Sequence, residues 1–251
     1  MKNSKKQIAT KRMEILFNNA LLNAKNNPGL AQRQAEIVKK ISLKFKIKMN
    51  ETLKNWKLTI GLEVHIQLST KSKMFCKCPV AYGSTPNSLI CSVCLGLPGA
   101  LPMINKEAIN MAIKLGHALN FKINQKTEFS RKNYYYPDLP KGYQITQFDK
   151  PICENGNIEI KKDGKAHKIG ITRAHIEEDS GKLIHHSDNY SFVDLNRAGS
   201  PLIEIVSEPE MHSSEDARLY LEKLKQIVKY INISDCDMEK GNLRVDINVS
   251  V

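Results

Sequence analysis

The sequence has no hydrophobic run long enough to cross a membrane. Its longest uncharged, mainly apolar stretch, residues 89–104, is shorter than the roughly 18 residues a spanning helix needs, and it contains two prolines. The N-terminus has no apolar core of the kind found in secretory signals. We therefore expect a protein without a membrane span, located in the cytoplasm, with reduced thiols.

A glycine-rich phosphate loop of the Walker or dinucleotide-binding type is also missing. Any nucleotide would therefore be held by a metal ion and by side chains on a sheet. With 41% apolar and 25% charged residues, the composition is that of a soluble globular protein, which excludes bulk disorder and a fibrous repeat. The 251 residues suffice for one large domain or two modest ones.

Positive charge is concentrated at the N-terminus. Residues 1–55 contain 13 Lys/Arg and 3 Asp/Glu, whereas the rest of the chain contains 25 and 23. Apolar residues at three- and four-residue steps predict a basic α-helical hairpin over residues 1–55, with its second helix starting near Pro28. Such a segment contacts RNA or phosphate, or is simply a solvated lysine-rich face.

Residues 1–50 resemble the helical N-terminal part of the zinc-ribbon protein subunit of archaeal ribonuclease P. The stretch that carries the resemblance is RMEILFNNALLNAKNNPGLAQRQAEIVKKISLKFKIKM, residues 12–49. The Cys-x-x-Cys ribbon that follows it in that family is missing here, so a fusion junction is one interpretation. The resemblance does not imply ribonuclease P activity.

Alternating apolar and polar residues predict strands in the remainder of the chain. The alternation is strict over residues 58–68 and returns over residues 243–251. Shorter strands are expected at 156–161, 167–177, 190–195 and 201–207, and helices after Asn105 and Ser213. The pattern predicts an α+β domain over residues 56–251, built around an antiparallel sheet.

Four cysteines have the spacing of a metal site. Cys76 and Cys78 form a Cys-x-Cys pair, and after twelve intervening residues Cys91 and Cys94 form a Cys-x-x-Cys pair. Four thiolates complete a tetrahedral zinc shell, so we expect a structural zinc within residues 74–96. The alternatives are unrelated buried thiols or disulfides. The two remaining cysteines, Cys153 and Cys236, are expected to be core thiols.

Acidic residues form a second group. Glu63, His65 and Gln67 share one face of the first expected strand, and Glu204 interrupts the apolar run 202–206. Further acids and a histidine lie in RAHIEEDSGK, residues 173–182. Oxygen ligands with one imidazole suit a Mg²⁺ that holds the phosphates of a nucleotide. The alternative is that each is a surface or salt-bridged group.

The segment 131–147, RKNYYYPDLPKGYQITQ, interleaves basic and aromatic residues. This composition suits a phosphate-bearing, base-stacking ligand such as a nucleotide or an RNA end. The alternative is an aromatic hairpin that packs on the sheet.

Seven motifs in order resemble the B subunit of the tRNA-dependent amidotransferase, over about residues 57–251. They are GLEVHIQL (61–68), KMFCKC (73–78), PNSLICSVCLGLPGALPMIN (86–105), RKNYYYPDLPKGYQITQFD (131–149), GITRAHIEEDSGK (170–182), VDLNRAGSPLIEIVSEPE (193–210) and GNLRVDINVSV (241–251). The resemblance implies a glutamine-synthetase-like cradle domain with a small zinc-binding insertion.

The resemblance also implies a reaction. It is the ATP-dependent amidation of mischarged Glu-tRNA(Gln), and often Asp-tRNA(Asn), through an acyl phosphate. Ammonia comes from the A subunit, which is the amidase, in a heterotrimer with the small C subunit. Four residues carry the implied catalytic and Mg²⁺-binding roles: Glu63, His65, Glu178 and Glu204. Arg131, Lys132 and Tyr134 are candidates for phosphate or adenosine contacts, and Arg173, Arg244 and Asp246 are further candidates.

Members of this family continue far beyond the motif VDINVSV, which is residues 245–251 here. The expectation is that a separate polypeptide completes the cradle, or that the chain is a remnant. The alternative function is a non-catalytic, zinc-stabilised RNA-binding or assembly protein.

Overall fold

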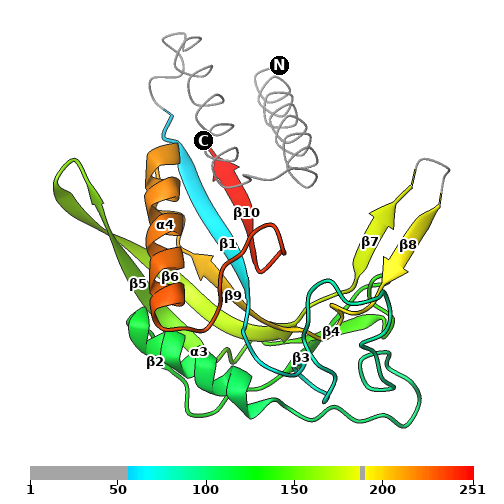
Figure 1. Cartoon of the computed structure of the whole chain (residues 1–251). Helices are drawn as coiled ribbons and strands as arrows, with labels where there is room; N and C mark the ends of the chain where they lie inside the picture. Colours follow the sequence, from blue (N-terminus) through cyan, green and yellow to red (C-terminus); the bar gives the residue numbers. More distant parts are fainter. Residues whose placement is uncertain (1–55, 187–189) are drawn as a thin grey trace, which may run out of the picture.

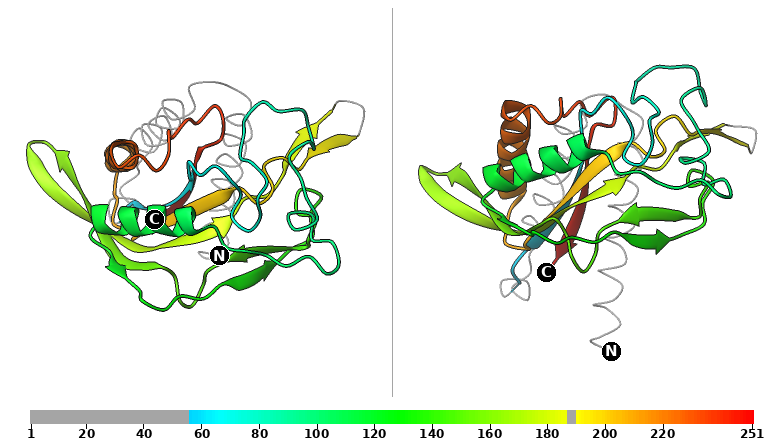
Figure 2. Two further views of the ribbon diagram at one scale, coloured as in Figure 1. Left: turned by 60° about the horizontal axis from the view of Figure 1, so that its bottom comes forward. Right: turned by 90° about the horizontal axis from the view of Figure 1, so that it is seen from below.

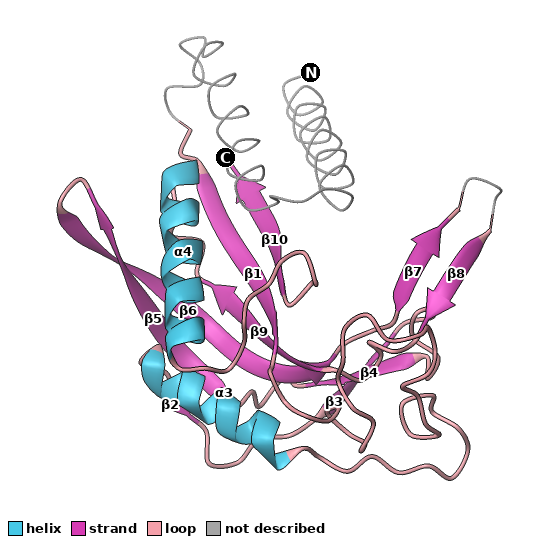
Figure 3. Ribbon diagram, viewed as in Figure 1, coloured by secondary structure: helices cyan, strands magenta, loops and turns pink. Residues whose placement is uncertain are grey.

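The computed structural model describes residues 56–186 and 190–251 (Figures 1 and 3). The expected hairpin of residues 1–55 lies outside the described residues, so it stays a prediction. The described elements are β1 (Thr59–Gln67), α3 (Lys106–Ala118), β2 (Lys122–Ile123), β3 (Ser130–Asn133), β4 (Tyr143–Thr146), β5 (Cys153–Lys162), β6 (Lys165–Glu178), β7 (Lys182–His185), β8 (Ser191–Asp194), β9 (Pro201–Ser207), α4 (Ser214–Tyr230) and β10 (Leu243–Ser250).

One large sheet organises the described part of the chain. Six strands lie in the order β10-β1-β9-β6-β5-β2, and every neighbouring pair is antiparallel. The hairpins β3–β4 and β7–β8 form separate two-stranded sheets, and β7–β8 projects away from the large sheet (Figures 1 and 2). The α+β class and the antiparallel sheet are confirmed. The likeness to a glutamine-synthetase cradle stays a prediction.

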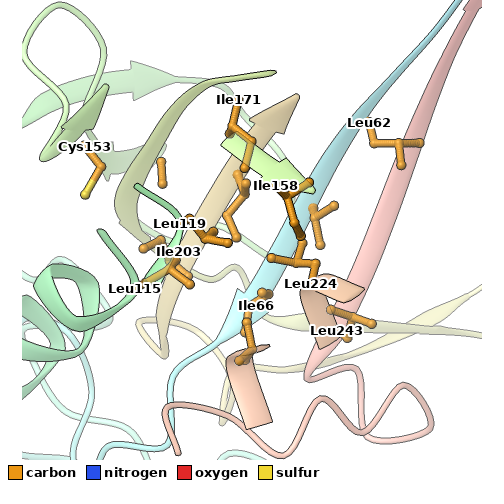
Figure 4. Close-up of a cluster of buried hydrophobic side chains, with 14 of the residues drawn as sticks. Leu62, Ile66, Leu115, Leu119, Cys153, Ile158, Ile171, Ile203, Leu224 and Leu243 are labelled. Carbon is orange, nitrogen blue, oxygen red and sulfur yellow. The ribbon is translucent and has the colours of Figure 1, made fainter. Parts of the chain in front are cut away.

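The core lies between one face of the sheet and the two helices. Alternate residues of β1 point into it, and each is at most 1% exposed: Ile60, Leu62, Val64 and Ile66. Leu115 and Leu119 from the α3 region and Leu224 from α4 join the same cluster (Figure 4). Cys153 and Cys236 are fully buried, as expected of core thiols. The polar residues of β1 therefore lie on the opposite face, which we call the open face.

Side-chain caps start both helices. The Asn105 side chain accepts a hydrogen bond from the backbone N–H of Glu107 at 2.9 Å, and Ser213 Oγ accepts one from the backbone N–H of Asp216 at 3.1 Å. Each satisfies a backbone donor that has no partner within the helix. Both predicted helix starts are confirmed.

Partway along strand β6, the residues that face the core switch from odd-numbered to even-numbered positions. In its first half Ile169 and Ile171 are buried in the core, but in its second half Ala174 and Ile176 are. The register against β9 shifts between Ile171 and Arg173, so β6 has an extra residue there. Such a bulge reverses which alternate residues face the core.

Candidate active site and metal centres

Four side chains from three neighbouring strands meet on the open face. His65 of β1 lies opposite Glu204 of β9, which lies opposite His175 of β6. Glu177 lies two residues beyond His175, so it points the same way. We call these four residues the carboxylate cluster.

The carboxylate cluster is tightly spaced. His65 Nε2 lies 3.1 Å from Glu204 Oε2 and 3.6 Å from Glu177 Oε1. His175 Nε2 lies 3.6 Å from Glu204 Oε2 and 3.5 Å from Glu177 Oε2. The two glutamates are only 3% and 8% exposed. Each carboxylate therefore lies between two imidazoles in a largely water-excluded position.

The imidazoles determine how these groups ionise. Burial alone would lower the pKa of His65, but its hydrogen bond to Glu204 and the two carboxylate charges outweigh burial and raise that pKa. Burial would raise the pKa of Glu177, but the hydrogen bond and charge of His175 outweigh it and lower that pKa. The pKa of Glu204 is lowered too, because His65 and His175 outweigh the effect of burial. Both glutamates are therefore anionic near neutral pH.

These groups fit a divalent ion. Donor atoms of His65, Glu177 and Glu204 all lie within 4.8 Å of one another. Carboxylate oxygens are the ligands that Mg²⁺ and Mn²⁺ prefer, and such ions keep several waters besides. Burying two carboxylates side by side is costly without positive charge between them. An ion bound among these atoms would supply that charge.

Glu178 lies elsewhere. Being one residue further along β6, it points away from the open face and forms an ion pair with Lys141. It also accepts a hydrogen bond from the backbone N–H of Ile145 at 2.9 Å. Burial outweighs the neighbouring Lys141 and raises the pKa of Glu178. The structure thus does not bring Glu178 together with Glu63, His65 and Glu204, and Glu177 takes its place.

Glu63 lies beside the carboxylate cluster, where β1 pairs with the edge strand β10. It lies directly opposite Asp246 and accepts a hydrogen bond from Asn248 Nδ2 at 2.9 Å. Asp246 Oδ2 is 3.9 Å from His65 Nδ1. Two acids directly opposite each other repel, which favours a cation nearby.

Arg244 and Arg173 border the open face. Arg244 lies opposite His65, and its Nη2 atom is 2.9 Å from Asp179 Oδ2. Arg173 lies opposite Val206 of β9, and its guanidinium lies 5.6 Å from the centre of the exposed Phe148 ring. In these positions both arginines would attract phosphate oxygens.

The segment 131–147 spans most of the hairpin β3–β4, and Tyr135 and Tyr136, in the loop between its strands, are exposed. Both interpretations of this segment stay predictions. The register puts Arg131 and Lys132 on opposite faces of the hairpin. Arg131 stacks 4.9 Å from the Tyr143 ring, whereas Lys132 shares its face with Thr146, whose hydroxyl donates to Glu177 at 2.9 Å. Burial and the Asp138 charge raise the pKa of Tyr134. The face of the hairpin that carries Lys132 and Thr146 therefore contacts the carboxylate cluster.

The four cysteines at 76, 78, 91 and 94 also meet, in the loop between β1 and α3. Their sulfur atoms lie within 4.8 Å of one another, and none forms a disulfide. Cys91 Sγ and Cys94 Sγ are 3.8 Å apart. Tetrahedral zinc with bonds of about 2.3 Å has sulfur–sulfur edges of about 3.8 Å, so this cysteine cluster fits zinc. A hydrogen bond from Cys76 is the main cause that lowers the pKa of Cys94, which favours a thiolate.

Taken together, the fold and these sites define an α+β protein with a candidate divalent-metal site on a sheet and a cluster of four cysteines in an adjoining loop. Comparison with known families then shows which family this chain belongs to. A family model described as "GatB/GatE catalytic domain" matches residues 58–251. The chain therefore belongs to the GatB/GatE catalytic domain family.

Curated relatives agree with the family. The B subunit of the aspartyl/glutamyl-tRNA(Asn/Gln) amidotransferase of Persephonella marina is 58% identical over 192 residues, covering 76% of this chain and 40% of that protein. The protein of the same name from Carboxydothermus hydrogenoformans is 55% identical over 203 residues, covering 79% of this chain and 42% of that protein. The chain thus spans about two fifths of the length of these relatives. Among the described residues, no helix has the length and apolar character to cross a membrane.

The cysteine cluster yields a direct test. We expect Cys91→Ser to lose stoichiometric zinc and to lower the thermal unfolding midpoint, because three thiolates hold the ion more weakly than four. Cys236→Ser is the control, since that cysteine is buried elsewhere in the core and should leave zinc content intact. Metal analysis and thermal unfolding of both variants measure the difference. Equal zinc in Cys91→Ser and the unmodified chain would rule out the tetrathiolate site.

The placement of Glu177 predicts a second result. Glu177→Gln should weaken Mn²⁺ binding by about 10-fold or more, because it removes one anionic ligand from a three-ligand site. A paramagnetic resonance titration of free Mn²⁺ measures the affinity. Glu159→Gln is the matched control, since this β5 glutamate is exposed. An affinity that drops in Glu178→Gln but not in Glu177→Gln would contradict the geometry.

Proposed function

We propose that this chain takes part in the ATP-dependent amidation of Glu-tRNA(Gln), Asp-tRNA(Asn) or both. The observation that carries the proposal is the carboxylate cluster, whose two buried anionic glutamates and histidine fit a divalent ion on the open face of the sheet. The family match and the names of the relatives support the same reaction. ATP, Mg²⁺ and a structural Zn²⁺ are the cofactors we propose.

The proposed chemistry has two steps. A carboxylate oxygen of the tRNA-linked Glu or Asp attacks the γ-phosphorus of ATP, and ADP leaves. Ammonia then attacks the acyl carbon, inorganic phosphate leaves, and the nitrogen loses a proton to give the amide. A bound Mg²⁺ would neutralise phosphate charge in the first step.

The side chains of the open face have distinct roles in this proposal. His65, Glu177 and Glu204 hold the ion, and Glu63 and Asp246 lie next to it as further acidic groups. The Asp246 side chain is 67% exposed and belongs to the edge strand β10, so solvent reaches this side of the proposed site.

Basic groups and a second histidine complete the proposed site. Arg244 and Arg173 border the same face and would orient phosphate oxygens. His175 contacts both carboxylates and so fixes their orientation. Glu178, paired with Lys141 on the other side of β6, has no ion-binding role here.

The partners are part of the proposal. Ammonia would come from glutamine through the A subunit, the amidase, and the small C subunit would complete the assembly. The mischarged tRNA would present its 3′ end to the open face. We also propose a cytoplasmic location for the chain.

A reconstituted assay tests the proposal. The full chain, purified with its partner subunits, is supplied with glutamine, ATP, Mg²⁺ and Glu-tRNA(Gln), and both ADP and Gln-tRNA are measured. We expect ADP release that requires the aminoacylated tRNA, and a loss of about 10- to 100-fold in His65→Ala, which removes an ion ligand.

A different outcome would favour the non-catalytic alternative. If tRNA binds equally well to Glu63→Ala and His65→Ala, without dependence on ATP or Mg²⁺, and no amide forms, the chain is an RNA-binding or assembly protein. Glu159→Gln again serves as a control for charge loss on an exposed strand position.

A further inference from the structure

A fully buried lysine lies against the cysteine cluster. Lys73 has no exposed surface, although lysine is among the residues least often buried completely. Its Nζ atom lies 3.7 Å from Cys94 Sγ and 3.5 Å from the backbone oxygen of Leu195. An ammonium group removed from water needs an anion close by, and the thiolate of Cys94 is within hydrogen-bonding distance.

The backbone of Lys73 contacts the same cluster. Its N–H donates to the carbonyl of Cys78 at 2.9 Å, which closes the turn that carries Cys76 and Cys78. Its carbonyl accepts from Asn105 Nδ2 at 3.3 Å, at the start of α3. The residue therefore joins both halves of the cysteine cluster, the first through its backbone and the second through its side chain.

Gly199 covers the lysine side chain. It has φ of +86°, a conformation that residues with a Cβ rarely adopt. A Cβ at this position would lie 3.4 Å from Lys73 Cδ and 3.5 Å from Cys94 Cβ. The backbone of the turn before β9 thus closes over the lysine and the cysteine together, and excludes water from their contact.

We infer that Lys73 is a charge-compensating residue for a metal-loaded cysteine cluster. Zinc bound by four thiolates carries a net charge of about −2, which is costly in a site partly shielded from water. The Lys73 ammonium offsets half of that charge and donates a hydrogen bond to one of the sulfurs. This role rests on the proposed zinc site.

The test compares the affinity of the full chain for Zn²⁺ in variants at position 73. We expect Lys73→Met and Lys73→Gln to weaken zinc binding by about 10-fold or more, the range seen when outer-shell partners are removed. Lys77→Met is the matched control, because Lys77 lies between Cys76 and Cys78 but is exposed, and it loses the same charge. Competition with a chromophoric chelator measures the affinities.

A spectroscopic readout separates charge compensation from a merely structural role. In protein loaded with Co²⁺, removing the ammonium should shift the sulfur-to-cobalt charge-transfer band of Lys73→Met to lower energy, since the thiolate loses its hydrogen bond. Lys73→Arg keeps the positive charge and should retain both the band and zinc binding.

Each failure has a distinct meaning. If the unmodified chain binds no zinc, the zinc site itself is wrong. If the unmodified chain binds zinc and Lys73→Met matches Lys77→Met in affinity and spectrum, the charge-compensating role is wrong. If the neutral variants do not fold, Lys73→Arg decides: folding with bound zinc supports the inference, and loss of zinc overturns it.

Discussion

Two glutamates, Glu177 and Glu204, hold their carboxylates side by side on the middle strands of a sheet, almost out of contact with water. Such a pair is unstable unless positive charge lies between the two groups. In the described structure the imidazoles of His65 and His175 each lie within 3.6 Å of both carboxylates, which raise the pKa of His65. Two buried carboxylates that so strongly favour positive charge nearby are well suited to hold a divalent ion.

The bulge in β6 makes this arrangement possible. Before the bulge, Ile169 and Ile171 face the core, so an uninterrupted strand would also turn His175 and Glu177 inward. The extra residue reverses the alternation and brings both to the open face. It also turns Glu178 to the other side, where Lys141 pairs with it. One inserted residue thus determines which of two adjacent glutamates can reach an ion.

Local patterns predicted most of the fold. The alternation in β1 and β10, the strand at β9 and the caps at Asn105 and Ser213 depend on neighbouring residues, and all are confirmed. The convergence of the four cysteines was also predicted, because paired spacing is a local signal. The sequence favours Glu178, whereas the structure groups Glu177 with His65 and Glu204, because the position of a bulge depends on pairing with a distant strand. The short strands β3, β4 and β7 lack strong alternation, so periodicity did not predict them, although a hairpin was one interpretation of residues 131–147.

The most direct test is a crystal of the full chain soaked in Mn²⁺, with diffraction data collected at the manganese absorption edge. The account predicts an anomalous peak on the open face, bounded by His65 Nε2 and the carboxylates of Glu177 and Glu204. A crystal with no peak at that position, or with its peak beside Glu178, would contradict it.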